Sequence, residues 1–562
     1  MVLRVQIAIF LFTAIAASSS VDPQPAPGRR RALLIGINDY SASRLGPPRT
    51  TAAPGREWPN LSGAVNDVGI LRDMLIRVHG FERRDIVTLT DQRATRTAIL
   101  KAIEQHLLKP ATKGDVLFLY YAGHGSQVRN SLSDEPDRLD ESIVPADSRL
   151  GARDIRDKEL RRTFNRILDR GARLTVFLDA CHSGSGARGG RTTGVRYRGV
   201  RRDERDVADG RKHGPRPEER GALVVSAAQD YDTAWERRDD EGQMHGAFSW
   251  AWIRAMRDAS SHESAEETFL RAQARLRAET PFQEPVLAGN TDVRFNPFLG
   301  VSTDRRDRAV IGVERVQSDG TVLLQGGWAN GLSVGSELSV LGDAARITSR
   351  LMITQILGPG KSAARIETGR TLPQDVRSGA LVEIVNWATS PAIHAWQLLE
   401  SPPEMRAPYC LALRRASDGE LVQENVVLGE ETYRLVLRAA TALAANIPPR
   451  YYYVLAIDSL GRSSLAFPRG GSVENRFPIG NATPEISLGD AGSIEIQRPY
   501  GIDTFFLLTT DEPLPNPWIL EKDGIRAPAV TPGTWSIEKF VYQSVAPKKV
   551  RSKTPQRVAN GV

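Results

Sequence analysis

Two reactive side chains follow apolar runs of similar length in this 562-residue chain. His124 stands between Gly123 and Gly125 after the run LFLYYA, and Cys181 follows the run RLTVFLDA. A free thiol has a pKa of about 8.5, so a nearby imidazole is needed to raise the thiolate fraction or to accept the proton during attack. If the two side chains meet, they can perform nucleophilic catalysis.

The first half of the chain alternates apolar strands with helices. Strands are predicted at 31–36, 85–91, 115–121, 173–180 and 221–228, and helices at 62–80, 95–107, 157–170, 248–256 and 265–278. This alternation indicates a parallel sheet covered by helices on both faces, in which sites form at the carboxyl ends of strands. His124 and Cys181 each lie just past such an end, so we expect them at one edge of the sheet.

Each of the two residues has a simpler interpretation when it is taken alone. A cysteine after a strand is more often a core residue, and a histidine is more often a surface or hydrogen-bonded side chain. The two glycine-flanked strand ends, 57 residues apart, leave room for a crossover helix and together favour a catalytic pair. His182 is a rival base, although its position next to Cys181 should turn its ring away.

Four separated segments now point to a family. ALLIGINDY, LSGAVNDV, YYAGHGSQ and LDACHSGSG occur in an order and spacing that resemble caspase-like peptidases, specifically type I metacaspases and their bacterial relatives, over residues 29–300. The resemblance implies a Cys–His dyad, with Cys181 as nucleophile and His124 as general base. It also implies that the N–H groups of Gly125 and Cys181 bind the oxyanion, and that cleavage follows Arg or Lys in polypeptide substrates.

A pocket for a basic side chain needs carboxylates, because a buried guanidinium must be paired. Asp179 lies two residues before Cys181 and therefore shares its face of the strand. Asp67 matches the second acidic pocket position of the family. We therefore predict that Asp67 and Asp179 line the S1 pocket, which holds the residue before the cleaved bond. A loop-capping role is the alternative for Asp179.

An acidic stretch, SLSDEPDRLDESIVPADS, contains the candidate cation ligands Asp134, Asp137, Asp140 and Glu141. Clustered carboxylates suit a hard cation such as Ca²⁺, although the spacing is not that of an EF-hand. Calcium-activated metacaspases have an acidic site of this kind, so the resemblance implies that Ca²⁺ stimulation is possible while no cofactor is required. The alternative is a solvated acidic loop.

Two basic segments account for the net charge of +7. Residues 185–220 form an Arg-rich linker with ten Arg, one Lys and six acidic residues, and the tail at 546–562 has five basic residues and no acid. We expect both to be solvated charge runs and predict no nucleic-acid partner. If the enzyme cleaves after Arg, the linker is its nearest substrate, and self-cleavage there is a hypothesis.

After the peptidase region the pattern changes to short alternating strands with glycine turns. We predict a small barrel-like β domain at 305–385 and a β-sandwich-like domain at 387–545. The expected fold class is therefore α/β, with a caspase-like, mostly parallel sheet flanked by helices, followed by two all-β domains whose ligand is unknown. The alternative function is a non-catalytic binding or scaffold protein with a vestigial caspase-like domain.

The chain starts with Arg4, an apolar run and small residues, which is typical of a signal peptide at 1–20. We therefore predict a secreted or periplasmic protein with no membrane span in the mature chain. An uncleaved membrane anchor is the alternative. Only two cysteines, Cys181 and Cys410, are present, which excludes a disulfide-rich scaffold, and we expect Cys181 to be free.

Overall fold

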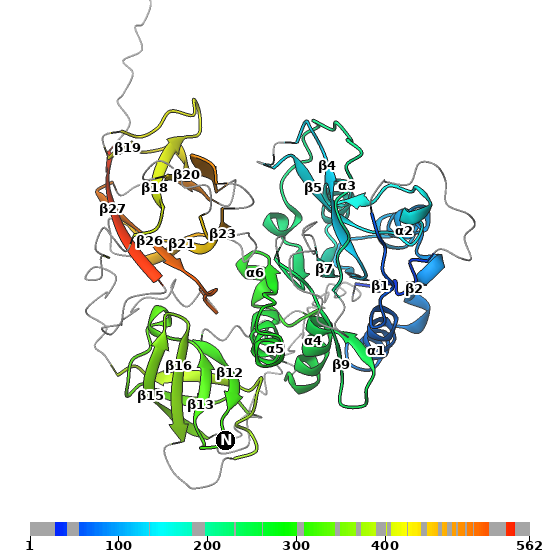
Figure 1. Cartoon of the computed structure of the whole chain (residues 1–562), viewed down its shortest axis with the longest axis horizontal. Coiled ribbons are helices and arrows are strands. Elements are labelled where there is room, and N and C mark those ends of the chain that lie inside the picture. The colour runs from blue at the N-terminus through cyan, green and yellow to red at the C-terminus, as the bar shows by residue number, and fades with distance from the viewer. Residues whose placement is uncertain are drawn as a thin grey trace, which may run out of the picture.

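The computed structural model describes three folded regions (Figure 1). The described residues are 28–41, 56–181 without 134 and 136, 197–300 without 230, 231 and 261, 308–342, 349–366, 373–388, 401, 406–423, 425–439, 447–458, 463–468, 475–478, 482–488, 492–497, 500–515, 517 and 535–545. The predicted signal peptide, the predicted basic tail, residues 182–184 and residues 185–196 of the predicted linker lie outside them.

The peptidase region is built on a six-stranded sheet with the order β11-β8-β7-β3-β1-β2. Its strands are β1 (Arg30–Gly36), β2 (Ile86–Thr90), β3 (Val116–Ala122), β7 (Arg173–Asp179), β8 (Leu223–Ser226) and β11 (Val286–Ala288). All neighbouring pairs are parallel except β11 with β8. The predicted caspase-like sheet is therefore confirmed, with one short antiparallel strand added at an edge.

Two helical layers cover this sheet because successive strand side chains point to opposite faces. Leu34 and Phe118 face one layer, and Leu33 and Leu119 face the other. The first layer contains α1 (Ala64–Arg77), α4 (Ala247–Asp258) and α5 (Ala265–Glu279), and the second contains α2 (Arg96–Ala102), its π-helical continuation Ile103–Leu108 and α3 (Asp157–Leu168). A short helix, α6 (Thr291–Arg294), follows β11.

Two smaller β elements stand at the carboxyl edge of the sheet. One is a three-stranded sheet of β4 (Gly125–Arg129), β5 (Leu139–Ile143) and β6 (Ile155–Arg156). The other is the antiparallel pair β9 (Glu236–Arg238) and β10 (Met244–Gly246). Because β4 starts directly after His124, the first of these sheets continues from the predicted site.

The second region is a closed six-stranded barrel. Its strands, in barrel order, are β12 (Val310–Val316), β13 (Val322–Gln325), β16 (Lys361–Ile366), β15 (Arg350–Gly358), β14 (Glu337–Val340) and β17 (Leu381–Asn386). Gly320, Gly331 and Gly335 have φ of 82°, 77° and 90°, which is the left-handed region that glycine adopts without strain. They are glycine turns of the kind predicted between the strands of this region.

The third region consists of two sheets with a shared core. One sheet contains β18 (Tyr409–Arg415), β20 (Thr432–Ala439), β24 (Glu485–Ser487) and β25 (Ser493–Glu495). The other contains β19 (Val426–Leu428), β27 (Trp535–Val545), β26 (Ile502–Thr510), β21 (Arg450–Ile457), β22 (Ser463–Phe467) and β23 (Arg476–Phe477). Leu411 and Leu435 of the first sheet share a buried cluster with Val454 and Leu507 of the second. This arrangement matches the predicted sandwich-like fold.

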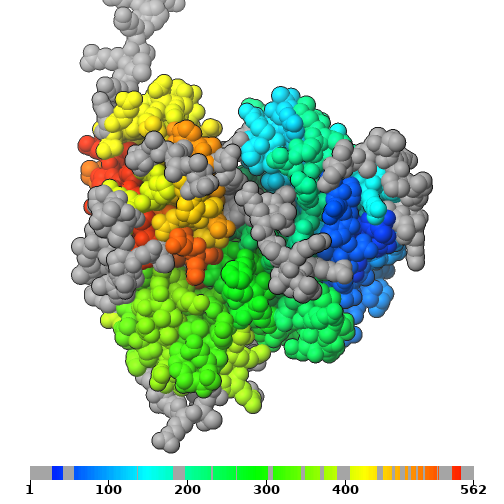
Figure 2. Space-filling model, viewed as in Figure 1, coloured from blue at the N-terminus to red at the C-terminus, as the bar shows by residue number. Residues whose placement is uncertain are grey.

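The two β regions lie side by side along one flank of the peptidase region (Figure 2). The barrel packs on α5, and Gly312 allows this approach because a Cβ there would lie 2.8 Å from Ala274 Cβ. The barrel and the sandwich meet through Trp328 and Trp535, whose ring centroids are 4.7 Å apart. No helix among the described residues is long and apolar enough to cross a membrane.

The prediction that the Arg-rich linker is a solvated charge run is wrong for three of its charged residues, whereas most other charged residues of 197–220 are exposed. Arg198 is fully buried, and Asp203 and Asp209 are also buried. Two acids of the linker pair with buried arginines of the peptidase region: Asp209 lies 2.8 Å from Arg156, and Asp203 lies 4.0 Å from Arg56. These buried charges attach the segment to the domain.

Candidate active site

His124 and Cys181 follow strands that end level with each other. β3 and β7 are neighbours in parallel register, and Ala122 pairs with Asp179 at their last residues. His124 and Cys181 each lie two residues beyond this pair. The N–H of Gly123 donates to the carbonyl of Asp179 at 3.3 Å and ties the two chain ends together. The structure thus brings the two predicted residues to the same edge of the sheet.

The imidazole of His124 is fully buried and held in one tautomer. Its Nε2 lies 2.6 Å from the carbonyl oxygen of Pro59, and a carbonyl can only accept, so Nε2 carries the proton. The ring packs against Tyr40 with centroids 4.6 Å apart. Nδ1 is buried without a hydrogen-bond partner. The free lone pair of Nδ1 is therefore the atom that could accept a proton.

The thiol of Cys181 is also buried, with 1% of the residue exposed. The N–H of Ala234 donates to Sγ at 2.8 Å, and Sγ lies 3.4 Å from the carbonyl oxygen of the same residue. No hydrogen bond joins Sγ to His124 in this conformation. Cys181 and Cys410 are both free, as expected for Cys181.

Burial holds both reactive groups in their neutral forms. It is the main reason that the pKa of the Cys181 thiol is raised to about 12 and that the pKa of His124 is lowered to about 4. Thiolate is the nucleophilic form, so attack from this conformation requires that the thiol first loses its proton to a base.

We therefore expect the intact chain to resist alkylation at Cys181. At neutral pH, iodoacetamide should modify Cys181 about tenfold or more slowly than the partly exposed Cys410, because Cys181 is both buried and protonated. The rate at Cys181 should rise with pH above neutrality, without a step near the ordinary pKa of histidine. Peptide mass spectrometry measures both sites in one sample, and faster labelling of Cys181 at neutral pH would contradict this description.

Three carboxylates surround one guanidinium beside the thiol. Arg198 forms ion pairs with Asp67 at 2.9 Å, Asp179 at 2.9 Å and Glu236 at 3.3 Å, and all four side chains are fully buried. The structure thus brings the two predicted pocket acids together and adds a third, from β9. Such a pocket is electrostatically suited to a cation and hostile to an anion.

Backbone donors hold two of these carboxylates in place. Asp67 accepts from the N–H of Gly246 at 2.9 Å, and Asp179 accepts from the N–H of Ser249 at 3.3 Å. The Asp67 bond links α1 to the end of β10, and the Asp179 bond links β7 to α4. Burial raises the pKa of Asp179, and the charge of Arg198 opposes this shift.

The carbonyl group of Arg198 is held by the two predicted oxyanion donors. Its oxygen accepts from the N–H of Gly125 at 3.0 Å and from the N–H of Cys181 at 2.9 Å. These distances lie within the range required of oxyanion donors. The next residue, Gly199, is so close to the thiol that an added Cβ would lie 3.7 Å from Cys181 Sγ. The Arg198–Gly199 peptide bond therefore lies at the nucleophile.

The chain on both sides of this bond is bound as an added strand. Before it, the N–H of Arg198 donates to the carbonyl of Ala234 at 2.9 Å, and Tyr197 pairs antiparallel with Trp235. After it, Gly199 pairs in parallel with Gly125 of β4. Peptides that bind by strand addition gain affinity from main-chain hydrogen bonds and specificity from side-chain pockets.

The residues after Gly199 continue along β4. The N–H of Val200 donates to the carbonyl oxygen of Gly125 at 2.9 Å. The N–H of Asp203 donates to the carbonyl oxygen of Gln127 at 2.7 Å. The N–H of Arg129 donates to the carbonyl oxygen of Asp203 at 2.9 Å. The linker therefore fills the groove on both sides of the thiol.

The predicted Ca²⁺ ligands are not arranged around one point. Asp134 lies outside the described residues. Asp137 accepts from the N–H of Leu139 at 3.1 Å. Asp140 and Glu141 are successive residues of β5, so their side chains leave opposite faces of the strand.

Protein donors already engage the carboxylate of Asp140. It accepts from Arg156 at 2.6 Å, from Asn130 at 3.0 Å and from Ser133 at 3.2 Å. Among the residues that the structure describes, no three His, Cys, Asp or Glu side chains form a group able to hold a metal ion. The described residues do not fit the Ca²⁺ that the family resemblance implies.

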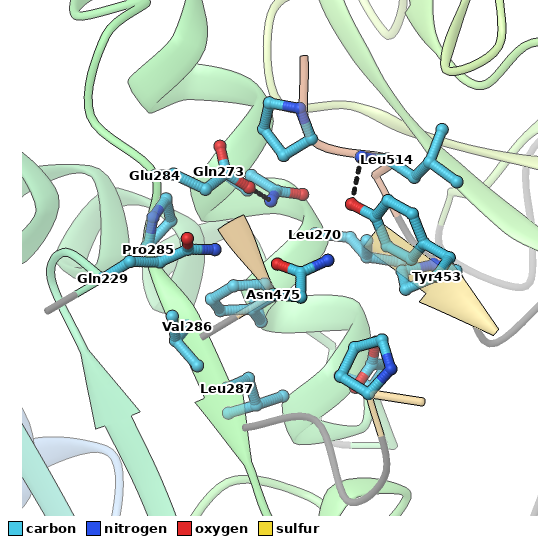
Figure 3. A pocket seen from close by; sticks show the side chains of 15 residues that line it. Gln229, Leu270, Gln273, Glu284, Pro285, Val286, Leu287, Tyr453, Asn475 and Leu514 are labelled. Atoms are coloured by element: carbon cyan, nitrogen blue, oxygen red, sulfur yellow. Dashed lines mark hydrogen bonds between the residues drawn. The ribbon is translucent and has the colours of Figure 1, made fainter. Parts of the chain in front are cut away.

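A separate, partly open pocket with a cavity volume of about 80 Å³ lies where α5 and β11 meet the sandwich (Figure 3). Phe269 and Leu287 from the peptidase region and Tyr453 and Leu514 from the sandwich are among its lining residues. Neither His124 nor Cys181 lines this cavity. It is distinct from the groove that holds Arg198.

The parallel sheet with His124 and Cys181 at one edge is the arrangement expected from the resemblance to caspase-like peptidases. Residues 30–187 match the family model of the metacaspase, peptidase C14 domain.

Three curated relatives show the same region of similarity. Metacaspase-1B of Aspergillus fumigatus is 39% identical over 164 residues, which cover 28% of this chain and 36% of the relative. Metacaspase-1A of Neurospora crassa is 38% identical, over 28% of this chain and 32% of the relative. Metacaspase-1 of Schizosaccharomyces pombe is 37% identical, over 28% of this chain and 34% of the relative. The match spans about a third of the length of these relatives.

Sequence reasoning missed three participants in the site. Arg198 was one of ten arginines in the linker, and nothing local distinguishes it except the glycine that follows. Glu236 lies in a hairpin whose position depends on the tertiary fold. Pro59 acts through its carbonyl oxygen, which leaves no signal in residue type.

Proposed function

We propose that this protein is a cysteine endopeptidase that cleaves polypeptides after Arg or Lys through the Cys181–His124 dyad. The observation that carries the proposal is Arg198, whose guanidinium lies among three buried carboxylates while its carbonyl oxygen accepts from two backbone N–H groups. An internal arginine thus occupies the position of a substrate residue before the cleaved bond.

In the proposed reaction the Cys181 thiol attacks the carbonyl carbon of the bound basic residue. The thiol proton passes to Nδ1 of His124, and the negative charge on the carbonyl oxygen is stabilised by the N–H groups of Gly125 and Cys181. The imidazolium then donates this proton to the departing amine as the C–N bond breaks. Water, deprotonated by His124, hydrolyses the thioester and restores the thiol.

The carbonyl of Pro59 supports this cycle by fixing the ring. Its oxygen accepts from Nε2–H and so leaves Nδ1 as the basic nitrogen. The same contact stabilises the imidazolium when it forms, since the carbonyl dipole is directed at the protonated ring. Tyr40 packs on the ring and restricts its rotation.

Selectivity for Arg or Lys follows from charge. Asp67, Asp179 and Glu236 give the pocket three carboxylates, which a basic side chain neutralises in part. An Asp side chain in the same place would add a fourth buried negative charge without a partner, and the cost of that arrangement is several kcal/mol, on the order of 3–5.

We also propose that the enzyme cleaves its own Arg198–Gly199 bond. Purified wild-type protein should yield a fragment that begins at Gly199, and Arg198→Lys should yield the same fragment, since Lys keeps the charge. Arg198→Gln should remain intact at this bond because a neutral amide leaves the carboxylates unpaired. Mass spectrometry of the whole protein identifies the new ends.

Two controls make this result specific. Arg202→Gln changes an exposed arginine of the same segment and should be processed like the wild type. Cys181→Ala should stay intact. Cleavage at Arg198–Gly199 in Cys181→Ala would assign the cut to another protease, and cleavage only at other arginines of the linker would refute the choice of bond.

We propose that the protein acts outside the cytoplasm, as a secreted or periplasmic enzyme. The observation that supports this is the signal-like composition of residues 1–20. Determination of the amino terminus of the mature protein tests it, and an uncut terminus in a membrane fraction would favour the anchor instead.

The β regions are proposed to bind a partner of unknown identity, and they alone would carry the function if Cys181 proved inert.

A further inference from the structure

A buried lysine lies inside the acidic stretch for which the sequence predicts Ca²⁺. Lys158, the second residue of α3, is 2% exposed. Its Nζ lies 2.7 Å from Glu135, 3.5 Å from Asp157 and 3.9 Å from Asp140. These carboxylates come from the 133–138 loop, α3 and β5, so one ammonium group joins three separate elements.

This position is unusual for a lysine. Lysine is almost never fully buried unless it is paired, because removing its charge from water is costly. Burial alone would lower its pKa, but Asp157 and Glu135 raise the pKa above the usual value, so the ammonium stays charged. Lys158 therefore places a positive charge among three carboxylates.

The cluster is also coupled to the groove. Asp140 binds Arg156 at 2.6 Å, and Arg156 binds Asp209 of the linker at 2.8 Å. The N–H of Asp209 in turn donates to Asn130 at 2.8 Å. Lys158 thus shares Asp140 with Arg156, the arginine that holds Asp209 in the segment following Arg198.

We propose that the ammonium group of Lys158 is the resident cation of this acidic cluster and that the protein folds and works without Ca²⁺. The same carboxylates would form a site for a hard divalent cation if the ammonium were replaced by another carboxylate. One oxygen of Asp157, Oδ1, is buried without a hydrogen-bond partner and would be available as a ligand there. The part of this proposal that concerns activity rests on the proposed peptidase function, whereas the part that concerns binding does not.

The test compares Lys158→Asp with two controls. Lys158→Met removes the charge and keeps the length of the side chain. Lys101→Asp makes the same charge reversal at an exposed position in α2. Each protein, in the Cys181→Ala background to prevent self-cleavage, is titrated with CaCl₂ by calorimetry and by thermal unfolding after treatment with a chelator.

We expect Lys158→Asp to be less stable than the parent without Ca²⁺ and to gain on the order of 3 °C in Tm at millimolar Ca²⁺, with measurable binding heat. The parent and Lys101→Asp should show neither response, and Lys158→Met should be destabilised without a comparable recovery. Millimolar or tighter binding of Ca²⁺ by the parent would overturn the proposal. A Lys158→Asp variant that folds but shows neither binding heat nor a gain in Tm with Ca²⁺ would also overturn the proposal. The same holds for a variant that fails to fold both with and without Ca²⁺.

Activity gives a second, separable readout. With Cys181 restored, the wild-type enzyme should hydrolyse an Arg-ending peptide at equal rates in chelator and in Ca²⁺. A rate that falls by about tenfold or more in chelator would overturn the claim that Lys158 suffices. Failure to hydrolyse the peptide under either condition would refute the peptidase assignment and leave the binding result standing.

Discussion

Replacing Cys181 with Ala should lower kcat/KM for an Arg-ending peptide by on the order of 10⁴-fold or more. His124→Ala should cause a loss of similar size, because a thiol whose pKa is raised to about 12 by burial needs a base to become nucleophilic. Both residues act in one proton transfer, so kcat/KM of the double variant should be no lower than kcat/KM of the less active single variant. Initial rates with a fluorogenic peptide measure all three.

The matched control for this prediction is Cys410→Ala. Cys410 is the other free thiol, and it lies on β18 of the sandwich. Its removal should leave the rate within about twofold of the wild type, because its side-chain hydrogen bond, to the carbonyl oxygen of Arg438 at 3.4 Å, lies within the sandwich. If Cys410→Ala were inactive and Cys181→Ala active, the nucleophile would be assigned to the wrong residue. Thermal unfolding of each variant separates loss of catalysis from loss of fold.

Asp179→Asn should lower kcat/KM for Arg-ending peptides by about 10²–10⁴-fold. Removing one partner of a buried ion pair costs about 3–5 kcal/mol, and each 1.4 kcal/mol is a factor of ten. Asp67→Asn should act in the same direction, since its carboxylate is equally buried and equally close to the guanidinium of Arg198.

The ratio of two substrates identifies the cause of this loss. A peptide ending in citrulline has the shape of the arginine peptide without its charge, so the wild type should strongly prefer arginine, and Asp179→Asn should lose most of that preference. A folding defect, or a change in how tightly Arg198 fills the groove, affects both substrates equally and leaves the ratio unchanged. Asp73→Asn, on the same helix as Asp67 but half-exposed, should keep the wild-type ratio. An unchanged ratio in Asp179→Asn would exclude this residue from the pocket.

Much of the fold was accessible from the sequence because its signals are local. The apolar runs at 115–121 and 173–180 are long enough to identify buried parallel strands, and the helices between strands require a crossover topology. Because parallel strands end at one edge, the same runs place His124 and Cys181 together. The turn glycines of the barrel were visible for a similar reason, since positive φ is a property of single residues.

The rest of the site depends on distant pairings that composition conceals. The linker has the composition of a solvated loop, yet Arg198 is buried because three carboxylates from α1, β7 and β9 converge on it. The acidic stretch has the composition of a cation site, yet the position of Lys158 becomes visible only when α3 packs beside β5. In both cases the identity of the counter-charge is decided by tertiary structure.

The most direct test of the central claim is the hydrolysis of two fluorogenic peptides, one ending in Arg and one in Asp, by the wild-type protein and by Cys181→Ala. We expect the wild type to hydrolyse only the Arg peptide and Cys181→Ala to hydrolyse neither. Preference for the Asp peptide would contradict the acidic pocket, and turnover that persists in Cys181→Ala would contradict a cysteine peptidase.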